Sequence, residues 1–548
     1  MMLKPQEMLK CDVLVIGSGG AGLRAAIVAG LKNANTLLVS KSRIGHPTNT
    51  YMSKAIIAAS GWGMPEDNKN VHMVDTIKGG RYLNDQAKVA MLAERAGSEV
   101  AFLKECGVNF ELEEGKPVVV KIPGHHYPRH VHGENWTGSD LIKPLRSRAE
   151  AAGVRFEEHV FITRLLTSDG KISGATGVTA DGNFIVIQAK AVVLATGGYA
   201  QIYLNTNNAA GITGDGLVLA FDVGVALKDM EFVQFYPTAM GKRGSRLLLY
   251  ERMLVQKGVV LKNSDGEDIL KKNDSDPTTI TRDQLAQLII KEIKDSPEGK
   301  QRIIMDLESL SEHTAKELTQ LLPPVWWKGQ KTYDVVPTTH FCMGGIETDK
   351  WGASSVGGLF AAGEATAGAH GANRLGGNAL AEVFSLGSLV GEKAADLAMN
   401  IGSPFPIKEA ADDEKNRLER QMSEVGESPR QLIQELKAQM WNNVGISREK
   451  NELEKALEYI QGPWPRAAVE NPAELIRLLE LQNMRIVAEM VCKAALKRTE
   501  SRGAHFRVDY PDEDNSRWLK NIVFRKGEVG MEVETTTVCQ DLVKPQRE

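Results

Sequence analysis

The segment CDVLVIGSGGAGLRAAIVAGL, residues 11–31, decides the fold. Its apolar run at 11–16, rich in branched residues, predicts a buried parallel strand, and residues 23–31 predict a helix. Between them, residues 17–22 carry the pattern GxGxxG, a turn that lets backbone amides at a helix N-terminus approach a pyrophosphate. A second apolar run at 36–39 completes a βαβ unit. The segment therefore predicts a nucleotide-binding α/β domain.

The residues that follow the second strand argue against a plain NAD site. An NAD site usually carries Asp or Glu at this point to hold a ribose, whereas this chain has Ser40 and Lys41. Further turns of the strand–glycine type follow at 191–198 and 357–364. Their wide separation predicts a nucleotide fold that is interrupted by an insertion at roughly 233–343.

Length and composition narrow the class of protein. The chain has 548 residues, and a single core stops growing at roughly 250–300, so two or three domains are expected. The net charge of −4 gives no electrostatic reason to expect nucleic acid as a partner. No apolar run approaches the ~20 residues that span a bilayer, and the first strand leaves no room for a signal peptide. A cytoplasmic protein is expected.

The cysteines predict no metal cluster in this chain. They are scattered, without a CxxC pair or an iron–sulfur spacing, at Cys11, Cys106, Cys342, Cys492 and Cys539. Reduced thiols are expected, and a one-electron partner would have to be a separate protein. Charge-rich helical periodicity at 408–460 and 472–500 predicts a helical domain, and 511–548 is expected to be a polar, peripheral tail.

Longer motifs run in order along nearly the whole chain. They are DTIKGG at 75–80, ATGG at 195–198, TGDG at 213–216, DMEFVQFYPT at 229–238, HFCMGGIETD at 340–349, AAGEA at 361–365, HGANRLGGNAL at 370–380 and ESRGAHFRVDYP at 500–511. With these motifs the chain resembles the flavoprotein subunit of succinate dehydrogenase and fumarate reductase.

The resemblance implies an α/β fold, in which a Rossmann-like FAD-binding domain is interrupted by an α+β capping domain and followed by a C-terminal helical domain. The FAD-binding domain is expected over 1–232 and 344–400. The capping or substrate domain would then occupy 233–343, the helical domain 401–510 and the tail 511–548.

The resemblance also implies which residues hold FAD. The expected cofactor-binding residues are Gly17, Ser18, Gly19, Gly20, Ala21, Gly22, Ser40, Lys41, Thr48, Asp215, Glu364, Asn378, Ala379 and Leu380. Respiratory members carry a histidine that bonds covalently to the flavin. In this chain Thr48 stands at that place, and His46 lies two residues earlier. FAD is therefore expected to be held without a covalent bond.

The reaction that the resemblance implies is hydride transfer between flavin N5 and one carbon of a C=C bond, with proton transfer at the adjacent carbon. Arg282 is the expected proton donor or acceptor, with Glu251 as the carboxylate that relays protons to it. His340 and Arg374 match the pair that clamps a substrate carboxylate, which arginine fits bidentately. The alternatives are that Arg282 is a surface charge at a helix start and that the clamp residues only pack.

The other half of the substrate cradle departs from the family pattern. Tyr236 replaces a histidine, Tyr250 replaces a threonine, and Leu254 replaces an arginine. Tyr236 and Tyr250 remain candidates for substrate contact. Because each charge-assisted hydrogen bond is worth ~1.5–3 kcal/mol, the substrate is expected to have one clamped carboxylate and a larger or less charged other end. Arg246 and Arg252 lie close enough in sequence to replace the lost cation.

A cluster of histidines is particular to this chain. Residues 125–132 hold four of its eleven histidines, at His125, His126, His130 and His132. The cluster could be a packed or solvated loop, a substrate contact or a metal site. No carboxylate or cysteine pattern supports a metal site, and none is predicted.

The leading hypothesis is an FAD-dependent oxidoreductase of the fumarate reductase/succinate dehydrogenase type that acts on a small carboxylate. It would exchange electrons with a separate iron–sulfur subunit, and it would reach a membrane only through partner subunits. One alternative is a relative such as aspartate oxidase or adenylylsulfate reductase, whose HGE-like segment matches residues 132–134. Another is an electron-relay subunit without substrate chemistry. Retention of Arg282, His340 and Arg374 argues against a relay.

Overall fold

The structure is a computed structural model of the chain. It describes residues 3–4, 6–240, 248, 258–276, 280–297, 301–318, 322, 329–402 and 407–545. Within these ranges, no helix is long and apolar enough to cross a membrane.

A five-stranded parallel sheet forms the nucleotide-binding core, in the order β20-β13-β2-β3-β9. Its strands are β2 (Val13–Ile16), β3 (Thr36–Val39), β9 (Arg155–Glu157), β13 (Ala191–Leu194) and β20 (Leu359–Ala361). The three central strands β2, β3 and β13 are buried along their whole length, which explains why their sequences are continuously apolar rather than alternating. The predicted α/β fold is confirmed.

Glycines hold the first strand and the first helix together at the GxGxxG turn. Gly17 has a φ of 108°, and a Cβ on it would lie 2.2 Å from the carbonyl oxygen of Ala195. A Cβ on Gly22 would lie 1.8 Å from the carbonyl oxygen of Gly17. The turn can therefore form only without side chains at these positions, and it delivers the N-terminus of α1 (Gly20–Leu31) to the end of the sheet.

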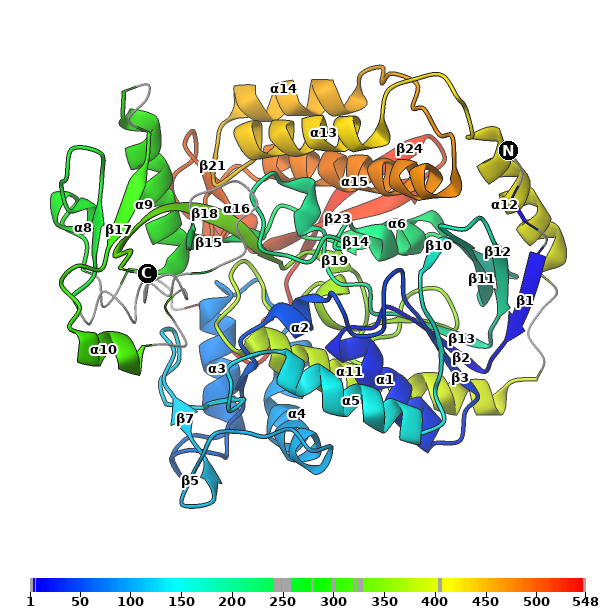
Figure 1. Cartoon of the computed structure of the whole chain (residues 1–548), viewed down its shortest axis with the longest axis horizontal. Helices are drawn as coiled ribbons and strands as arrows, with labels where there is room; N and C mark the ends of the chain where they lie inside the picture. The colour runs from blue at the N-terminus through cyan, green and yellow to red at the C-terminus, as the bar shows by residue number, and fades with distance from the viewer. Residues whose placement is uncertain are drawn as a thin grey trace.

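The long helix α11 (Asn378–Asn400) packs directly on α1, as Figure 1 shows. Gly387 and Gly391 of α11 face α1, and a Cβ on Gly391 would lie 2.3 Å from the carbonyl oxygen of Ala25. This close approach buries most of α11.

The first half of the chain adds smaller elements around this core. The sheet β1-β12-β11-β10 consists of β1 (Gln6–Lys10), β10 (Val160–Ser168), β11 (Lys171–Thr179) and β12 (Phe184–Gln188). The helices are α2 (Asn49–Met52), α3 (Lys69–Gly79), α4 (Gln86–Glu105), α5 (Ser139–Ala151), η1 (Ala200–Ile202), α6 (Asp215–Asp222) and η3 (Gly363–Ala365). The short strands are β4 (Ile56–Ala58), β5 (Leu112–Glu113), β6 (Lys116–Pro117), β7 (Val119–Val120) and β8 (His130–His132).

Residues 233–343 contain an antiparallel sheet with its own hydrophobic core. Its order is β15-β18-β17-β16, with β15 (Val233–Met240), β16 (Val260–Lys262), β17 (Ile303–Asp306) and β18 (Thr332–Cys342). The helices α8 (Ile269–Lys272), α9 (Arg282–Asp295) and α10 (Glu312–Glu317) lie with β17 at one end of the molecule (Figure 1). Thr281 and Gln284 form a reciprocal capping box that starts α9 at Arg282.

The C-terminal part is largely helical, as the periodicity predicts. Its helices are α12 (Lys408–Arg420), α13 (Pro429–Asn443), α14 (Lys450–Gln461), α15 (Pro472–Lys497) and α16 (Asn515–Trp518), and the strands β21 (Ser447–Arg448) and β22 (Phe506–Arg507) pair with each other. Figure 1 shows α13, α14 and α15 side by side, and α15 also packs on α6.

The end of the chain differs from the expected peripheral tail. Strands β23 (Lys520–Gly527) and β24 (Gly530–Thr537) form a hairpin that joins β14 (Leu227–Lys228) and β19 (Gly345–Ile346) in one sheet. Ile522, Val523 and Phe524 are fully buried. The polar appearance of the segment comes from β24, whose residues are mostly exposed at the edge of this sheet.

Candidate active site

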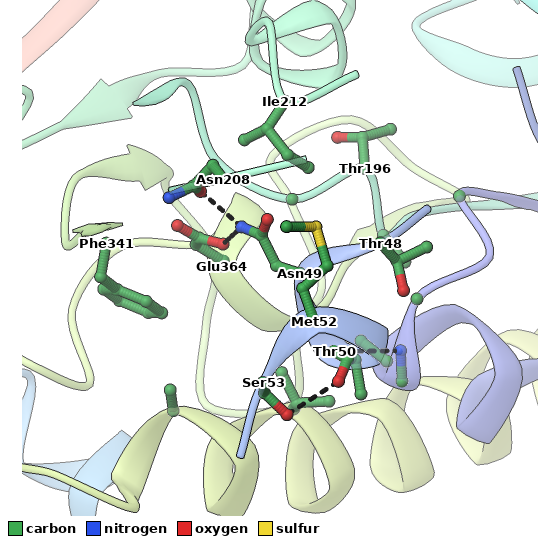
Figure 2. Close-up of a pocket in the computed structure, with 18 of the residues that line it drawn as sticks. Thr48, Asn49, Thr50, Met52, Ser53, Thr196, Asn208, Ile212, Phe341 and Glu364 are labelled. Carbon is green, nitrogen blue, oxygen red and sulfur yellow. Dashed lines mark hydrogen bonds between the residues drawn. The ribbon is translucent and has the colours of Figure 1, made fainter. Parts of the chain in front are cut away.

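One cavity of about 420 Å³ brings together most of the predicted site residues. It runs past the glycine turn, α2, the loop at 207–215, the end of β18 and the start of α11, and Figure 2 shows part of it. The predicted residues that line it are Gly17, Ser18, Gly19, Gly20, Ala21, Lys41, Thr48, Asp215, Tyr236, Arg282, His340, Glu364, Arg374, Ala379 and Leu380.

Three predicted cofactor residues stand behind the cavity wall. Gly22 packs against the glycine turn, as described above. Ser40 holds Ser18 through a hydroxyl–hydroxyl hydrogen bond of 2.9 Å. Asn378 bonds His72 through its Oδ1, at 2.8 Å. Of these contacts, the one between Ser40 and Ser18 supports a lining residue directly. Tyr250 and Glu251 lie outside the described residues, as do Leu254, Arg246 and Arg252.

The glycine-turn end of the cavity suits an anionic group. Backbone amides at the start of α1 face the lining, and Gly20 N donates to Thr50 Oγ1 at 3.1 Å. Helix N-termini carry partial positive charge, and this one opens onto the cavity where a Cβ on Gly19 would meet no atom closer than 3.7 Å. The residues therefore fit a pyrophosphate such as that of FAD.

Lys41 organises polar groups at the next part of the cavity. Its ammonium donates to Asp215 at 2.6 Å and to Glu480 of α15 at 2.8 Å. Burial lowers the pKa of Lys41, but the two carboxylates outweigh burial and hold this pKa above its ordinary value. The lysine is thus charged, and it fixes carboxylate oxygens that can accept hydrogen bonds from the hydroxyls of a ribose.

Thr48 and His46 are placed differently toward the cavity. Thr48 lines it and also caps α2, where its Oγ1 accepts from Tyr51 N at 3.2 Å. His46 is exposed, packs edge-on against the ring of Tyr51 and does not line the cavity.

At the other end of the cavity, two arginines from separate parts of the chain meet. Arg282 opens α9 and lies with its guanidinium carbon 4.8 Å from the centre of the Tyr236 ring. Arg374 is 6% exposed, and its Nη2 donates to Gln234 Oε1 at 2.9 Å. Burial and then repulsion from Arg282 lower the pKa of Arg374 to about 9. Among the described residues, neither arginine forms an ion pair, and Arg374 Nε has no hydrogen-bond partner.

The neighbouring guanidiniums of Arg282 and Arg374 favour the binding of an anion. Two guanidinium groups that share a partly buried site repel one another, and a buried charge without a counter-charge is costly. A carboxylate placed between them would remove both penalties at once. The arrangement therefore supports the predicted clamp geometry of Arg374 and the predicted position of Arg282.

His340 completes this end of the cavity as a neutral group. It lies on β18, its ring is edge-on to Tyr236 at 5.5 Å, and its Nδ1 contacts the side chain of Asn207. Burial, followed by the charges of Arg374 and Arg282, holds the pKa of His340 well below its ordinary value. A neutral imidazole offers one donor and one acceptor to a bound molecule.

Glu364 lines the cavity between the glycine turn and the two arginines. Its Oε2 accepts from Asn49 Nδ2 at 2.9 Å and its Oε1 from Cys342 N at 3.2 Å, and Figure 2 shows the first of these bonds. Burial raises the pKa of Glu364 to about 7, although both hydrogen bonds oppose this shift. The carboxyl can therefore gain or lose a proton near neutral pH.

The sequence prediction missed several residues of this site. Asn49, Asn207 and Asn208 form a side-chain network, and Gln234 and Phe341 hold Arg374. A signal was present, since Asn207 and Asn208 belong to the run NTNN just before the TGDG motif. Their partners lie more than a hundred residues away, so the sequence could not show what they hold.

The histidine cluster is mostly packed behind the cavity wall. His125 and His130 both direct Nε2 at the carbonyl oxygen of Gly376, at 3.1 Å each. The fully buried Arg129 bonds Asp67 at 2.7 Å and Asp75 at 3.0 Å. In the part of the chain that the structure describes, no group of three or more His, Cys, Asp or Glu residues is arranged to hold a metal ion.

Comparison with known proteins agrees with this geometry. The family of FAD binding domains matches residues 12–380, and the fumarate reductase flavoprotein C-terminal family matches residues 433–548. The fumarate reductase (CoM/CoB) of Methanothermobacter marburgensis has a subunit that is 34% identical, over 95% of this chain and 98% of its own length.

Among solved structures, Sdh1 of Mycobacterium smegmatis, in complex with UQ1, is 33% identical with a TM-score of 0.88, over 98% of this chain and 96% of that one. Adenylylsulfate reductase of Archaeoglobus fulgidus has a TM-score of 0.80, over 100% of this chain and 99% of its own, at 19% identity, which shows a shared fold only.

Two observations identify the family. The cavity joins the glycine turn to the site of Arg282 and Arg374, and the matches to known proteins extend along nearly the whole chain. The protein is an FAD-dependent oxidoreductase and belongs to the flavoprotein-subunit family of succinate dehydrogenase and fumarate reductase.

Proposed function

We propose that this flavoprotein catalyses hydride transfer between FAD and a C=C bond of a small carboxylate, in the manner of fumarate reductase. One observation carries the proposal: Arg282 and Arg374, cations without a carboxylate partner among the described residues, converge in the cavity that the glycine turn opens. Bound FAD supplies the hydride donor or acceptor.

Each residue of the clamp has a distinct task in this proposal. Arg374, held by Gln234 and stacked 4.7 Å from the Phe341 ring, binds one carboxylate of the substrate with its planar fork. His340 donates a hydrogen bond to the same substrate carboxylate or to a neighbouring oxygen of the substrate. The two cations also stabilise the negative charge that develops on the substrate as hydride is transferred.

Arg282 is placed to hold the transferred proton. It stands at the start of α9, near enough to Arg374 for its charge to lower the pKa of Arg374, and Tyr236 supports its guanidinium face. From this position its guanidinium can release a proton to the substrate carbon. Reprotonation requires a carboxylate relay, for which Glu251 is the candidate.

The substrate is proposed to have one carboxylate in the clamp and a bulkier or less charged second end. Tyr236, Ile122 and Leu248 line the cavity on this side, and they offer an aromatic ring and two apolar groups. Fumarate is the default substrate, and its monoesters and monoamides keep one carboxylate while replacing the other. FAD is proposed to be bound without a covalent link.

The electron partner is proposed to be a separate iron–sulfur subunit. Among the described residues, the cysteines are free and no cluster-like group of ligands is formed, so electron transfer through an iron–sulfur cluster would need a separate protein. The matched relative is itself named as a subunit, which supports the same view. Purification from the native source would test this part, and a chain that elutes alone with full activity toward its physiological donor would contradict it.

The substrate proposal is tested with the purified holoenzyme under anaerobic conditions. A reduced viologen dye reduces the flavin, and then fumarate, its monomethyl ester or its monoamide is added while dye oxidation is recorded. Turnover of at least one of these compounds is expected, with the monoesters competitive with fumarate. If none of the three reoxidises the dye, the proposed chemistry is wrong and the relay alternative gains support.

A further inference from the structure

Three asparagines beside the clamp form a continuous series of hydrogen bonds that ends on His340. Asn49 lies on α2, and Asn207 and Asn208 lie in the loop before α6. Figure 2 shows Asn49 between Asn208 and Glu364. Each asparagine can present either its oxygen or its nitrogen to a neighbour, so the direction of the series has to be worked out from its fixed end.

The fixed end is a backbone amide. Ala209 N, which can only donate, lies 3.0 Å from Asn49 Oδ1, so this oxygen is the acceptor. Asn49 Nδ2 is then the donor to Glu364 and to Asn208 Oδ1. This assignment leaves Asn208 Nδ2 to donate to the carbonyl oxygen of His340, at 2.9 Å.

The orientation of the Asn207 amide follows from that of the Asn208 amide. Asn208 Nδ2 also donates to Asn207 Oδ1, at 3.3 Å, so Asn207 keeps its Nδ2 for another partner. That partner is His340, whose Nδ1 lies 3.1 Å from Asn207 Nδ2 and 3.3 Å from Asn207 Oδ1, the oxygen that already accepts from Asn208. The shorter contact is to the amide nitrogen, which donates, so Nδ1 of His340 is assigned as the acceptor. A neutral imidazole that accepts at Nδ1 carries its proton at Nε2.

We propose that Asn207 is a positioning residue that holds His340 in the Nε2–H tautomer, so that His340 meets the substrate as a neutral hydrogen-bond donor. This inference rests on the proposed function of His340 in the clamp. Among the described residues, the groups that face the imidazole are the guanidiniums of Arg374 and Arg282, the ring of Tyr236 and the amide of Asn207. None of these described groups is a carboxylate that would favour an imidazolium.

The fixed tautomer narrows the class of substrate. A donor at Nε2 requires an acceptor on the bound molecule, which means a carboxylate, carbonyl or ester oxygen rather than an amino group. A neutral donor also adds a hydrogen bond without adding a third positive charge beside two arginines that already repel. A carboxylate of charge −1 can therefore satisfy this end of the cavity.

The first test is spectroscopic and does not depend on turnover. The FAD-loaded enzyme is labelled with ¹⁵N-histidine, and the His340 resonances are assigned by comparison with His340→Gln. In the wild type, protonation at Nε2 and a bare Nδ1 are expected. In Asn207→Asp, one carboxylate oxygen still accepts from Asn208 and the other accepts from Nδ1–H, so the proton is expected at Nδ1. Asn443→Asp, on α13, is the matched control and should leave the His340 signals unchanged.

The second test is the pH profile of kcat/KM for whichever carboxylate the wild type turns over. The carboxylate that Asn207→Asp introduces raises the pKa of His340, so this variant should be active at low pH, where the imidazolium carries Nε2–H. Its kcat/KM should fall about 10- to 100-fold relative to the wild type as pH rises through this pKa, because one hydrogen bond to a charged group is lost. Asn443→Asp should follow the wild type.

Two results would overturn the inference. The first is a wild-type enzyme with the proton at Nδ1 of His340. The second is an Asn207→Asp variant whose His340 signals and pH profile match those of the wild type. If the wild type turns over no carboxylate, the proposed function fails, but the nitrogen signals still decide the tautomer.

Discussion

The guanidinium of Arg282 lies 4.8 Å from the centre of the Tyr236 ring, so the first residue of α9 is held against the strand that leads into the cavity. Tyr236 is 2% exposed, and the resemblance to the family implies that it replaces a histidine. Its ring gives Arg282 a flat support through a cation–π contact, but its hydroxyl cannot supply the charge that a histidine can.

The first prediction follows from this contact. Tyr236→His should raise kcat/KM for fumarate relative to fumarate monomethyl ester by about tenfold, since a cationic or donating imidazole favours the second carboxylate. The ratio of the two rates under reduced dye measures this preference. Tyr203→His would be a poor control because Tyr203 is fully buried, so the exposed Tyr510→His is the appropriate one. An unchanged ratio would show that Tyr236 does not set the preference.

The second prediction concerns Arg282 itself. Arg282→Ala should lower kcat by about 10²- to 10⁴-fold, the range typical of a lost general acid, while the protein keeps its FAD. Flavin absorbance of the purified variant and dye oxidation measure the two properties separately. Arg302→Ala, which removes an exposed arginine of the same region, should retain both. Full activity of Arg282→Ala would support the relay alternative.

The third prediction concerns the flavin link. Acid precipitation of the holoenzyme should release all FAD into the supernatant, because Thr48 lines the cavity and the exposed His46 does not. Absorbance and fluorescence of pellet and supernatant measure the partition. His46→Ala should behave identically to the wild type. Yellow colour that stays with the wild-type pellet would show a covalent bond.

The glycine turn could be predicted from the sequence alone, whereas the contact between Asn207 and His340 could not. Turns and helix starts depend on neighbouring residues, so GxGxxG and the Arg282 helix start could be predicted directly. The contact between Asn207 and His340 joins residues 133 positions apart, and nothing local marks it. The hairpin at 520–537 reads as a tail for the same reason, because its partner strand lies at Leu227–Lys228.

The fourth prediction concerns stability and pH. Burial raises the pKa of Glu364 from 4.5 to about 7 in the folded protein, so the native state binds a proton that the unfolded state releases between these values. The contribution of Glu364 to the free energy of unfolding should therefore be fully present below about 4.5 and be lost as pH rises through about 7, by up to about 3 kcal/mol.

Glu364→Gln should lack this part of the pH dependence, since its amide does not titrate. Urea unfolding of both proteins at pH 5 and pH 8 gives the difference. Burial and Glu231 also raise the pKa of Asp229 to about 7, but this effect is common to both proteins and cancels. The exposed Glu532→Gln is the control and should match the wild type. Parallel profiles for the wild type and Glu364→Gln would contradict the prediction.

The fifth prediction concerns the wall behind the cavity. Arg129→Met leaves the buried carboxylates of Asp67 and Asp75 without their cation and should lower the free energy of unfolding by about 3–5 kcal/mol. Arg146→Met, which removes an exposed pair with Glu150, should cost less than about 1 kcal/mol. Urea denaturation followed by circular dichroism measures both. Equal stabilities would show that the buried pair does not hold this wall.

The hairpin β23–β24 has a consequence for biosynthesis. Asp229, which joins β14 to the strand of Tyr236, accepts hydrogen bonds from Ile522 N and Asn521, close to the end of the chain. Asp229 and Ile522 are 293 positions apart, so these bonds can form only after residue 522 has emerged from the ribosome. Until then, a nascent chain lacks this support for the connection that leads into the strand of Tyr236.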